Sequence, residues 1–355
     1  MAAGYQNKAV LNNGTTWGTL PALNFATLGV SLASMPAASM SRADTDPSGV
    51  GMEFPGTTNR GGIVASDMTF DFLLSYEHIW RAMSLFTSDT VTAGEGGPPA
   101  QHFHAMTPPA SPQRTFIGAY INVPNPGNTG DTTRGLQVKS FAGTGFELSG
   151  TLGEVAQLSI SGIPYSVEPV AAATITAATF PAGNSLITVG AGDTDLFAIA
   201  TAGDPVSNLG ISSFTFRWNT PREAGAHTTA EEYVALPDRS GTGTGELVIR
   251  VPGFVPTASL AEFTTPTEKN ALITLPSATV GAAAMSCKIK FPRLVLKAFD
   301  PAGSGTGATA HEFTYRIYAD PEGTAEANCD TAGGAPWEIT VANSESADYD
   351  TAVSS

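Results

Sequence analysis

Apolar and polar residues alternate along most of this chain, the pattern of β-strands that bury one face. In residues 213–219, Phe214, Phe216 and Trp218 occupy every second position, and residues 313–317 and 287–291 repeat the pattern. Further candidate strands, bounded by Gly, Pro, Asn or Asp, are residues 115–123, 135–141, 145–151, 156–162, 246–251, 271–275 and 337–341. Many short strands with such boundaries predict an all-β fold of the antiparallel sandwich or barrel class.

One stretch has a helical period instead. Between residues 72 and 86, Phe72, Tyr76, Ile79, Trp80 and Met83 recur at spacings of four, three, one and three. This spacing places them on one stripe of a helix that packs against the sheets. Residues 68–72 alternate, so a strand is expected to run straight into the helix. The predicted fold is therefore all-β with one packed α-helix.

The pattern also predicts how the chain is organised. Residues 1–60 show little periodicity and many turn residues, and we expect an N-terminal arm or loop there. Residues 61–319 are expected to form the main β domain, in which the Ala/Gly/Thr-rich residues 171–205 connect two β halves. Residues 320–355 contain acidic residues and no basic ones, which predicts an acidic C-terminal extension.

Charge and composition exclude several classes of protein. The 355 residues carry 17 Lys and Arg against 32 Asp and Glu, a net charge of −15. This balance argues against a dedicated nucleic-acid binder, which needs a basic footprint. No apolar run is long enough to span a membrane, and the N-terminus lacks the pattern of a secretory signal. Two cysteines cannot form a disulfide framework, so synthesis in a reducing cytoplasm is expected.

The candidate chemical sites are sparse. His102 and His104 would place two imidazoles on one face of a strand, which is half of a metal site, but no Cys or carboxylate clusters beside them. The other histidines, His78, His227 and His311, are scattered. We interpret His102 and His104 as packing or surface residues and expect no metal, catalytic or cofactor site.

Other motifs also have structural interpretations. The glycine-rich segments at 241–246 and 303–307 lack the Lys and Ser/Thr of a phosphate loop and the strand-to-helix context of a dinucleotide site, so both predict hairpin loops. Residues 141–145 predict a turn between two strands. Carboxylates at 193 and 195, and at 231 and 232, are expected in loops. Cys287 and Cys329 are expected to be unpaired thiols.

An ordered series of weak motifs resembles the major tail tube proteins of tailed bacteriophages. The resemblance covers most of residues 13–319, and no single motif in it is diagnostic. The motifs are NGTTWGT at 13–19, GGI at 61–63, the aromatic helix through Trp80, residues 102–123, GLQVKSF at 135–141, GFEL at 145–148, AQLSISG at 156–162, SFTFRWN at 213–219 and IKFPRLVL at 289–296.

The resemblance implies a structural protein rather than an enzyme. Such subunits form hexameric rings that stack helically into a hollow tail tube, through which double-stranded DNA passes into the host without specific binding. Implied partners are further copies of the chain, a tape measure protein and a tail terminator, and the implied location is the virion tail. Because a basic wall would attract DNA, we expect few Lys or Arg on the surface that lines the tube.

Two alternatives stay open. A capsid decoration or fibre-type protein would use the same short strands to bind a shell or a host glycan, and it would not polymerise. A β-rich hydrolase or metal enzyme would depend on His102 and His104. Filaments of the purified protein would favour the tail tube. Exposed aromatic platforms and trimers would favour the decoration or fibre protein, and a metal bound at the two histidines would favour the enzyme.

Overall fold

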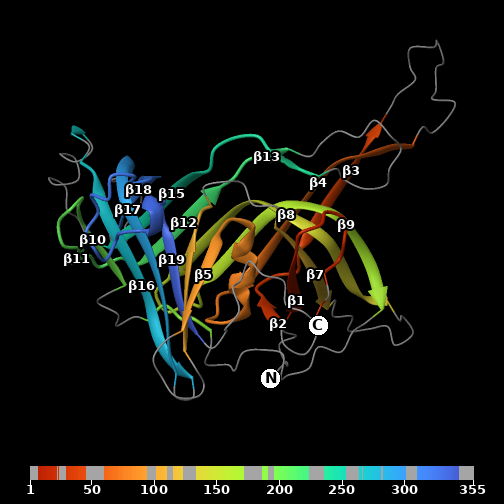
Figure 1. Ribbon diagram of the computed structural model, residues 1–355, viewed down its shortest axis with the longest axis horizontal. Helices are drawn as coiled ribbons and strands as arrows, with labels where there is room; N and C mark the ends of the chain where they lie inside the picture. Colours follow the sequence, from red (N-terminus) through yellow and green to blue (C-terminus); the bar gives the residue numbers. More distant parts are fainter. Residues whose placement is uncertain are drawn as a thin grey trace, which may run out of the picture.

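The computed structural model is mostly β-strand, which confirms the all-β fold class predicted above (Figure 1). It describes residues 7–21, 23, 29–44, 60–93, 101–109, 115–122, 133–171, 186–190, 196–223, 236–252, 264–265, 267–280, 283–300 and 310–343. Nearly all strand pairs are parts of one extended antiparallel network, so one hydrophobic core runs through the molecule.

A closed ring of strands forms one half of the network. Each strand pairs with the next in the order β1, β2, β4, β9, β8, β7 and back to β1. A further strand, β3, pairs with β4 outside the ring. The strands are β1 (Asn7–Gly14), β2 (Gly29–Leu32), β3 (Ala37–Asp44), β4 (Arg60–Leu73), β7 (Phe116–Asn122), β8 (Thr133–Thr151) and β9 (Gln157–Ala171).

The other half consists of two sheets that share β17. One sheet runs from β8 through β12, β15 and β18 to β17, and the other runs from β17 through β19 and β6 to β5. On its other edge β17 pairs with β16, which leads to β10 and β11. These strands are β5 (Ser88–Ala93), β6 (His102–Thr107), β10 (Phe197–Thr201), β11 (Ser207–Asn208), β12 (Ser213–Asn219), β15 (Thr244–Pro252), β16 (Lys269–Val280), β17 (Ala283–Asp300), β18 (Ala310–Tyr318) and β19 (Glu338–Asn343). A separate short pair consists of β13 (Arg222–Glu223) and β14 (Asp238–Arg239).

Two long strands join these parts. Strand β8 pairs with β9 along most of its length, while its first half also pairs with β7 and its second half with β12. It contains both predicted strands, 135–141 and 145–151, so the turn expected at 141–145 is wrong. Instead, Ser140 has a φ of 46° and the register with β9 shifts between Gly143 and Gly145. The chain therefore bends within one strand, as at a β-bulge.

The helix differs from the prediction in type and length. It is a 3₁₀ helix, η2 (His78–Leu85), rather than an α-helix over residues 72–86. Phe72 belongs to β4 and pairs with β9, so its apolar side chain is buried as part of the alternation of that strand. Residues 79–85 are all buried, so the helix is surrounded by the core instead of covering it with one face.

Aromatic rings fill the space between the layers. The centroids of Phe146 and Phe216 lie 5.1 Å apart, and Phe216 contacts Phe291 at 5.0 Å and Trp337 at 5.4 Å, all edge to face. Trp337 is fully buried, and β19 follows it between β17 and β6. Within the expected acidic extension 320–355, residues 337–343 are therefore part of the core.

The other expected segments also contain strands. Residues 1–60, expected as an arm, contribute β1, β2 and β3 to the sheet network. Within the expected connection 171–205, β10 pairs with β16, and residues 186 and 188 form isolated bridges to Ser75 and Val155. The described strands of these segments are therefore part of the sheet network.

Candidate functional site

One face of the sheet is polar across seven neighbouring strands, in the order β4, β9, β8, β12, β15, β18 and β17. In β12, Phe214, Phe216 and Trp218 are buried, whereas Thr215 and Arg217 are not, which confirms the predicted alternation. Because side chains alternate between the two faces of a strand, the polar residues of paired strands lie together on the outer face.

A line of charged and hydroxyl residues crosses this face at right angles to the strands. Each residue lies directly opposite the next in the order Asp71, Ser159, Glu147, Arg217, Glu246 and Arg316. Lys297 of β17 joins the end of the line through an ion pair with Glu246. We call these seven residues the charged row. Segments far apart in the sequence meet here only because the strands pair in this register.

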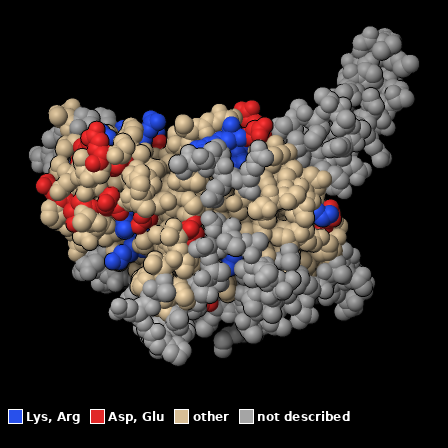
Figure 2. Space-filling model, in the orientation of Figure 1, with Lys and Arg blue, Asp and Glu red and all other residues tan. Residues whose placement is uncertain are grey.

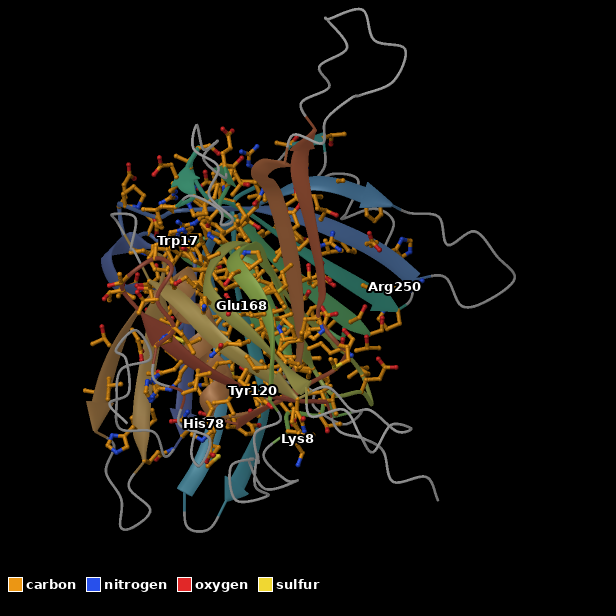
Figure 3. The ribbon with its side chains drawn as sticks, turned by 90° about the vertical axis from the view of Figure 1, so that its right-hand side faces the viewer. Lys8, Trp17, His78, Tyr120, Glu168 and Arg250 are labelled. Carbon is orange, nitrogen blue, oxygen red and sulfur yellow. The ribbon has the colours of Figure 1, made fainter. Side chains whose placement is uncertain are left out.

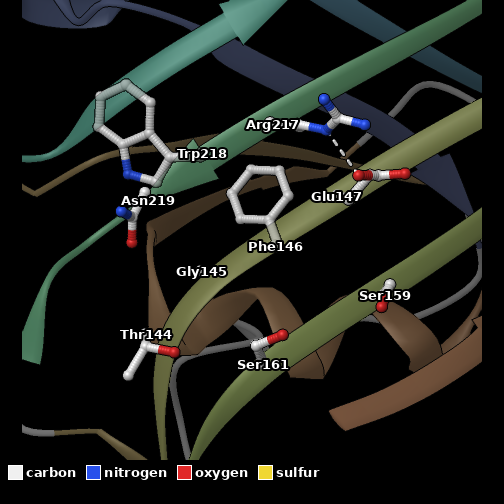
Figure 4. A pocket seen from close by; sticks show the side chains of 9 residues that line it. All are labelled: Thr144, Gly145, Phe146, Glu147, Ser159, Ser161, Arg217, Trp218 and Asn219. Carbon is white, nitrogen blue, oxygen red and sulfur yellow. Dashed lines mark hydrogen bonds and ion pairs between the residues drawn. The ribbon is translucent and has the colours of Figure 1, made fainter.

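Six members of the charged row contact one another in three pairs. The Ser159 hydroxyl donates to Asp71 Oδ1 and the Ser34 hydroxyl to Asp71 Oδ2, each at 2.7 Å. Arg217 Nε donates to Glu147 Oε2 at 2.7 Å (Figure 4). Lys297 Nζ donates to Glu246 Oε1. These contacts hold charges of both signs in a fixed order along the row.

The ion pairs of the charged row are too exposed to stabilise the fold strongly. The Arg217 and Glu147 side chains are 54% and 40% exposed, and Lys297 is exposed to the same degree as Arg217. Ion pairs with this exposure contribute about 0–1 kcal/mol. On the side of the molecule in Figure 2, most Lys and Arg atoms likewise adjoin Asp and Glu atoms, between broad uncharged areas.

Small polar residues surround the charged row and leave two shallow hollows on it. The first, of about 310 Å³, is lined by Thr144, Gly145, Phe146, Glu147, Ser159, Ser161, Arg217, Trp218 and Asn219 (Figure 4). The second, of about 380 Å³, is lined by Arg217, Asn219, Thr244, Gly245, Glu246 and Arg316. The face is therefore rich in hydroxyl, amide and charged groups, and the apolar rings lie beneath it.

The glycine-rich segment 241–246 makes room for Trp218. A Cβ at Gly243 would lie 2.5 Å from the Trp218 ring, and one at Gly245 would lie 2.6 Å from it. The prediction of a hairpin loop here is wrong. The segment connects β14 to β15, but β14 pairs with β13, whereas β15 pairs with β12 and β18. Gly245 is already part of β15. The glycines are needed because the indole packs directly against this backbone.

Two hairpins extend beyond the body of the sheet. Among the described residues, residues 60–67 of β4 pair with β3 alone, and this hairpin leads away from the body (Figures 1 and 3). Residues 278–280 of β16 and 283–285 of β17 likewise pair only with each other in the described chain. Such strands expose backbone donors and acceptors to which another chain can bind.

A buried serine joins two of the motifs that carry the family resemblance. Ser140, in the motif at 135–141, accepts a hydrogen bond from Gly18 N at 2.9 Å, and its hydroxyl lies 3.2 Å from Thr16 O and 3.1 Å from Thr19 O. Gly18 has a φ of 81°, which favours glycine. The neighbouring Trp17 packs edge to face on Phe116 and Tyr165. The motif at 13–19 is thus a turn fastened to the bend of β8.

His102 and His104, the two candidate metal ligands, both lie in strand β6. His104 is fully buried on β6, and its Nδ1 lies 2.7 Å from Asp89 Oδ2 of β5, whereas His102 is partly buried. Within the described residues, no three His, Cys, Asp or Glu side chains are grouped as a metal site would require. The His104–Asp89 contact therefore joins two paired strands.

The two thiols are free, as expected, and both are buried. Burial raises the pKa of the Cys287 thiol far above its usual value. Burial also raises the pKa of Cys329 to about 12, with a smaller contribution from Glu326. A thiolate is the reactive form of cysteine, so neither side chain is suited to nucleophilic chemistry.

Several candidates lie outside the described residues. These are the glycine-rich segment 303–307, His227, and the carboxylates at 193, 195, 231 and 232.

Sequence reasoning missed the charged row. The alternation of apolar and polar residues indicates which side chains point outward, but it does not give the register between strands.

No protein-family model and no curated protein sequence matches this chain. In the portion that the structure describes, none of the helices is long and apolar enough to cross a membrane.

Proposed function

We propose that this chain is a structural virion protein that polymerises as stacked rings, with six copies in each ring, into the tail tube of a bacteriophage. The proposal joins the ordered motifs of residues 13–319 to the polar face of the sheet. Its partners would be further copies of the chain, a tape measure protein and a tail terminator. It would act without a cofactor or catalytic residues, as a conduit for DNA.

The observation that carries the proposal is the charged row on a broad polar face. Duplex DNA carries one negative charge per about 1.7 Å of its axis, so unpaired cations on a channel wall would hold it. On this face Arg217 is paired with Glu147, and Lys297 with Glu246. We propose that this face lines the tube, where Arg217 and Lys297, each paired with a carboxylate, replace the nearly cation-free wall expected from the net charge.

The hairpins supply surfaces for polymerisation. The β3–β4 hairpin offers an edge strand beyond the body of the sheet, as does the end of β16–β17. An edge strand can add a strand from another copy through backbone hydrogen bonds. If the contact joins different surfaces of the two copies, it can close a ring or continue as an open filament.

Negative-stain electron microscopy and sedimentation velocity of the purified protein over a concentration series test the proposal. We expect hollow filaments with a regular axial repeat and a sedimentation coefficient that increases with concentration. Discrete monomers or trimers at every concentration would overturn the proposal and favour a decoration or fibre protein.

A further inference from the structure

The charged row is electrically polar from one end to the other. Its β4 and β8 positions carry the carboxylates Asp71 and Glu147. Its β12, β15, β18 and β17 positions carry three cations, Arg217, Arg316 and Lys297, and the single carboxylate Glu246. One end of the row is therefore negative and the other is positive.

The two ends lie on the first and the last of the seven strands that carry the polar face. Among the described residues, Asp71 is flanked by the segment after β2, where Ala33 N donates to Asp71 O and Ser34 donates to the carboxylate, and β3 pairs with β4 from Thr69 to Arg60. At the other end, residues 295–300 of β17 pair with β18 alone among the described residues. The row spans seven strands, or about 29 Å at a strand spacing of ~4.8 Å. The two ends are therefore far enough apart to contact two different molecules.

We infer that neighbouring copies in a ring join these ends, so that the Asp71 end of one copy lies against the Lys297 and Arg316 end of the next. This inference rests on the proposed ring assembly and specifies its contact and direction. The negative end of the row is complementary to the positive end of the same row. A second copy therefore supplies the charge that each end needs, which favours a second copy over an unrelated partner. Opposite ends in contact form a head-to-tail interface, the type that builds rings.

Two charge reversals test the contact. Asp71→Lys makes both ends positive, and Lys297→Glu with Arg316→Glu makes both ends negative. Like charges placed opposite one another in an interface are strongly unfavourable, so each variant alone should raise the concentration needed for assembly by about tenfold or more. An equimolar mixture should assemble near the wild-type concentration, because the two variants then have complementary ends and can alternate around a ring.

Lys288→Glu is the matched control, since Lys288 is exposed on β17 outside the charged row. It should assemble as the wild type does. Circular dichroism of each variant verifies folding, and sedimentation velocity with electron microscopy measures assembly. If the wild type assembles and the reversed variants assemble at the same concentration, or if the mixture fails to restore assembly, the inference is wrong although the proposed function stands. A wild type that never assembles would overturn the proposed function and the inference together.

Discussion

Trp337 provides a quantitative test of whether the acidic C-terminal segment is part of the fold. Its side chain is fully buried, and its ring lies edge to face against Phe146, Phe216 and Trp218 at 5.5, 5.4 and 5.6 Å. Truncating a buried Trp to Ala removes its transfer energy and leaves a cavity, which together amount to about 3–5 kcal/mol. Domains unfold with about 5–15 kcal/mol, so Trp337→Ala should remove a large fraction of the total stability.

Urea unfolding followed by far-ultraviolet circular dichroism measures this loss. We expect a decrease of about 4 kcal/mol for Trp337→Ala and a smaller one for Trp337→Phe, which retains a ring in the same space. Phe103→Ala is the control, since Phe103 is 45% exposed and should change stability by less than about 0.5 kcal/mol. A loss below about 1 kcal/mol for Trp337→Ala would refute the reasoning that this segment completes the core.

Three other predictions concern the turn, the thiols and an ion pair. Ser140→Ala should destabilise the protein by about 1–3 kcal/mol in urea, because the Gly18 N–H loses its partner; an equal effect of Ser149→Ala on the polar face would contradict this. Neither Cys287 nor Cys329 should react with a thiol reagent in the native protein at pH 8, and both should react in guanidinium chloride; rapid native labelling would be inconsistent with their burial. A hydrogen bond from Lys139, with a smaller contribution from Ser166, lowers the pKa of Glu168 below its usual value of 4.5. The interaction between Lys139 and Glu168 therefore stabilises the fold fully above pH 4.5, and this stabilisation is lost as the pH falls through the lowered pKa. The difference in unfolding free energy between wild type and Lys139→Met should accordingly be largest near neutral pH and shrink in acid, and a difference independent of pH would exclude the ion pair as its source.

Sequence periodicity predicted the strands that bury only one face. The alternation at 213–219 matches the burial of β12 because its other face is exposed to solvent. The same argument missed β1, where Ala9, Val10 and Leu11 are buried in succession. A strand covered on both sides has no alternation, so residues 1–60 looked unstructured. The α-helix predicted from the apolar stripe at 72–86 was wrong for a related reason. The stripe combines the end of strand β4 with a 3₁₀ helix whose residues 79–85 are all buried.

The charged row was beyond the reach of sequence reasoning because it depends on non-local pairing. Asp71 and Ser159 are 88 residues apart, and Arg217 and Glu147 are 70 residues apart. Alternation indicates that each points outward, but a shift of one residue in any register would separate them. The aromatic core beneath the face fixes that register, and a single sequence does not show which strand pairs with which.

The order of charges in the row has different consequences within one chain and between chains. Within the chain each exposed pair contributes about 1 kcal/mol or less, and the two ends, about 29 Å apart, are screened because the Debye length is ~8 Å at physiological salt. Between copies, Asp71 and Lys297 would come within contact distance, where like charges are strongly unfavourable and opposite charges are favourable. A fixed row whose two ends carry opposite charge therefore has little influence on folding and a large influence on which edges can meet. Raising the salt concentration should for this reason weaken assembly before it weakens the folded subunit, and equal sensitivity of the two in sedimentation and circular dichroism would argue against an electrostatic selection of direction.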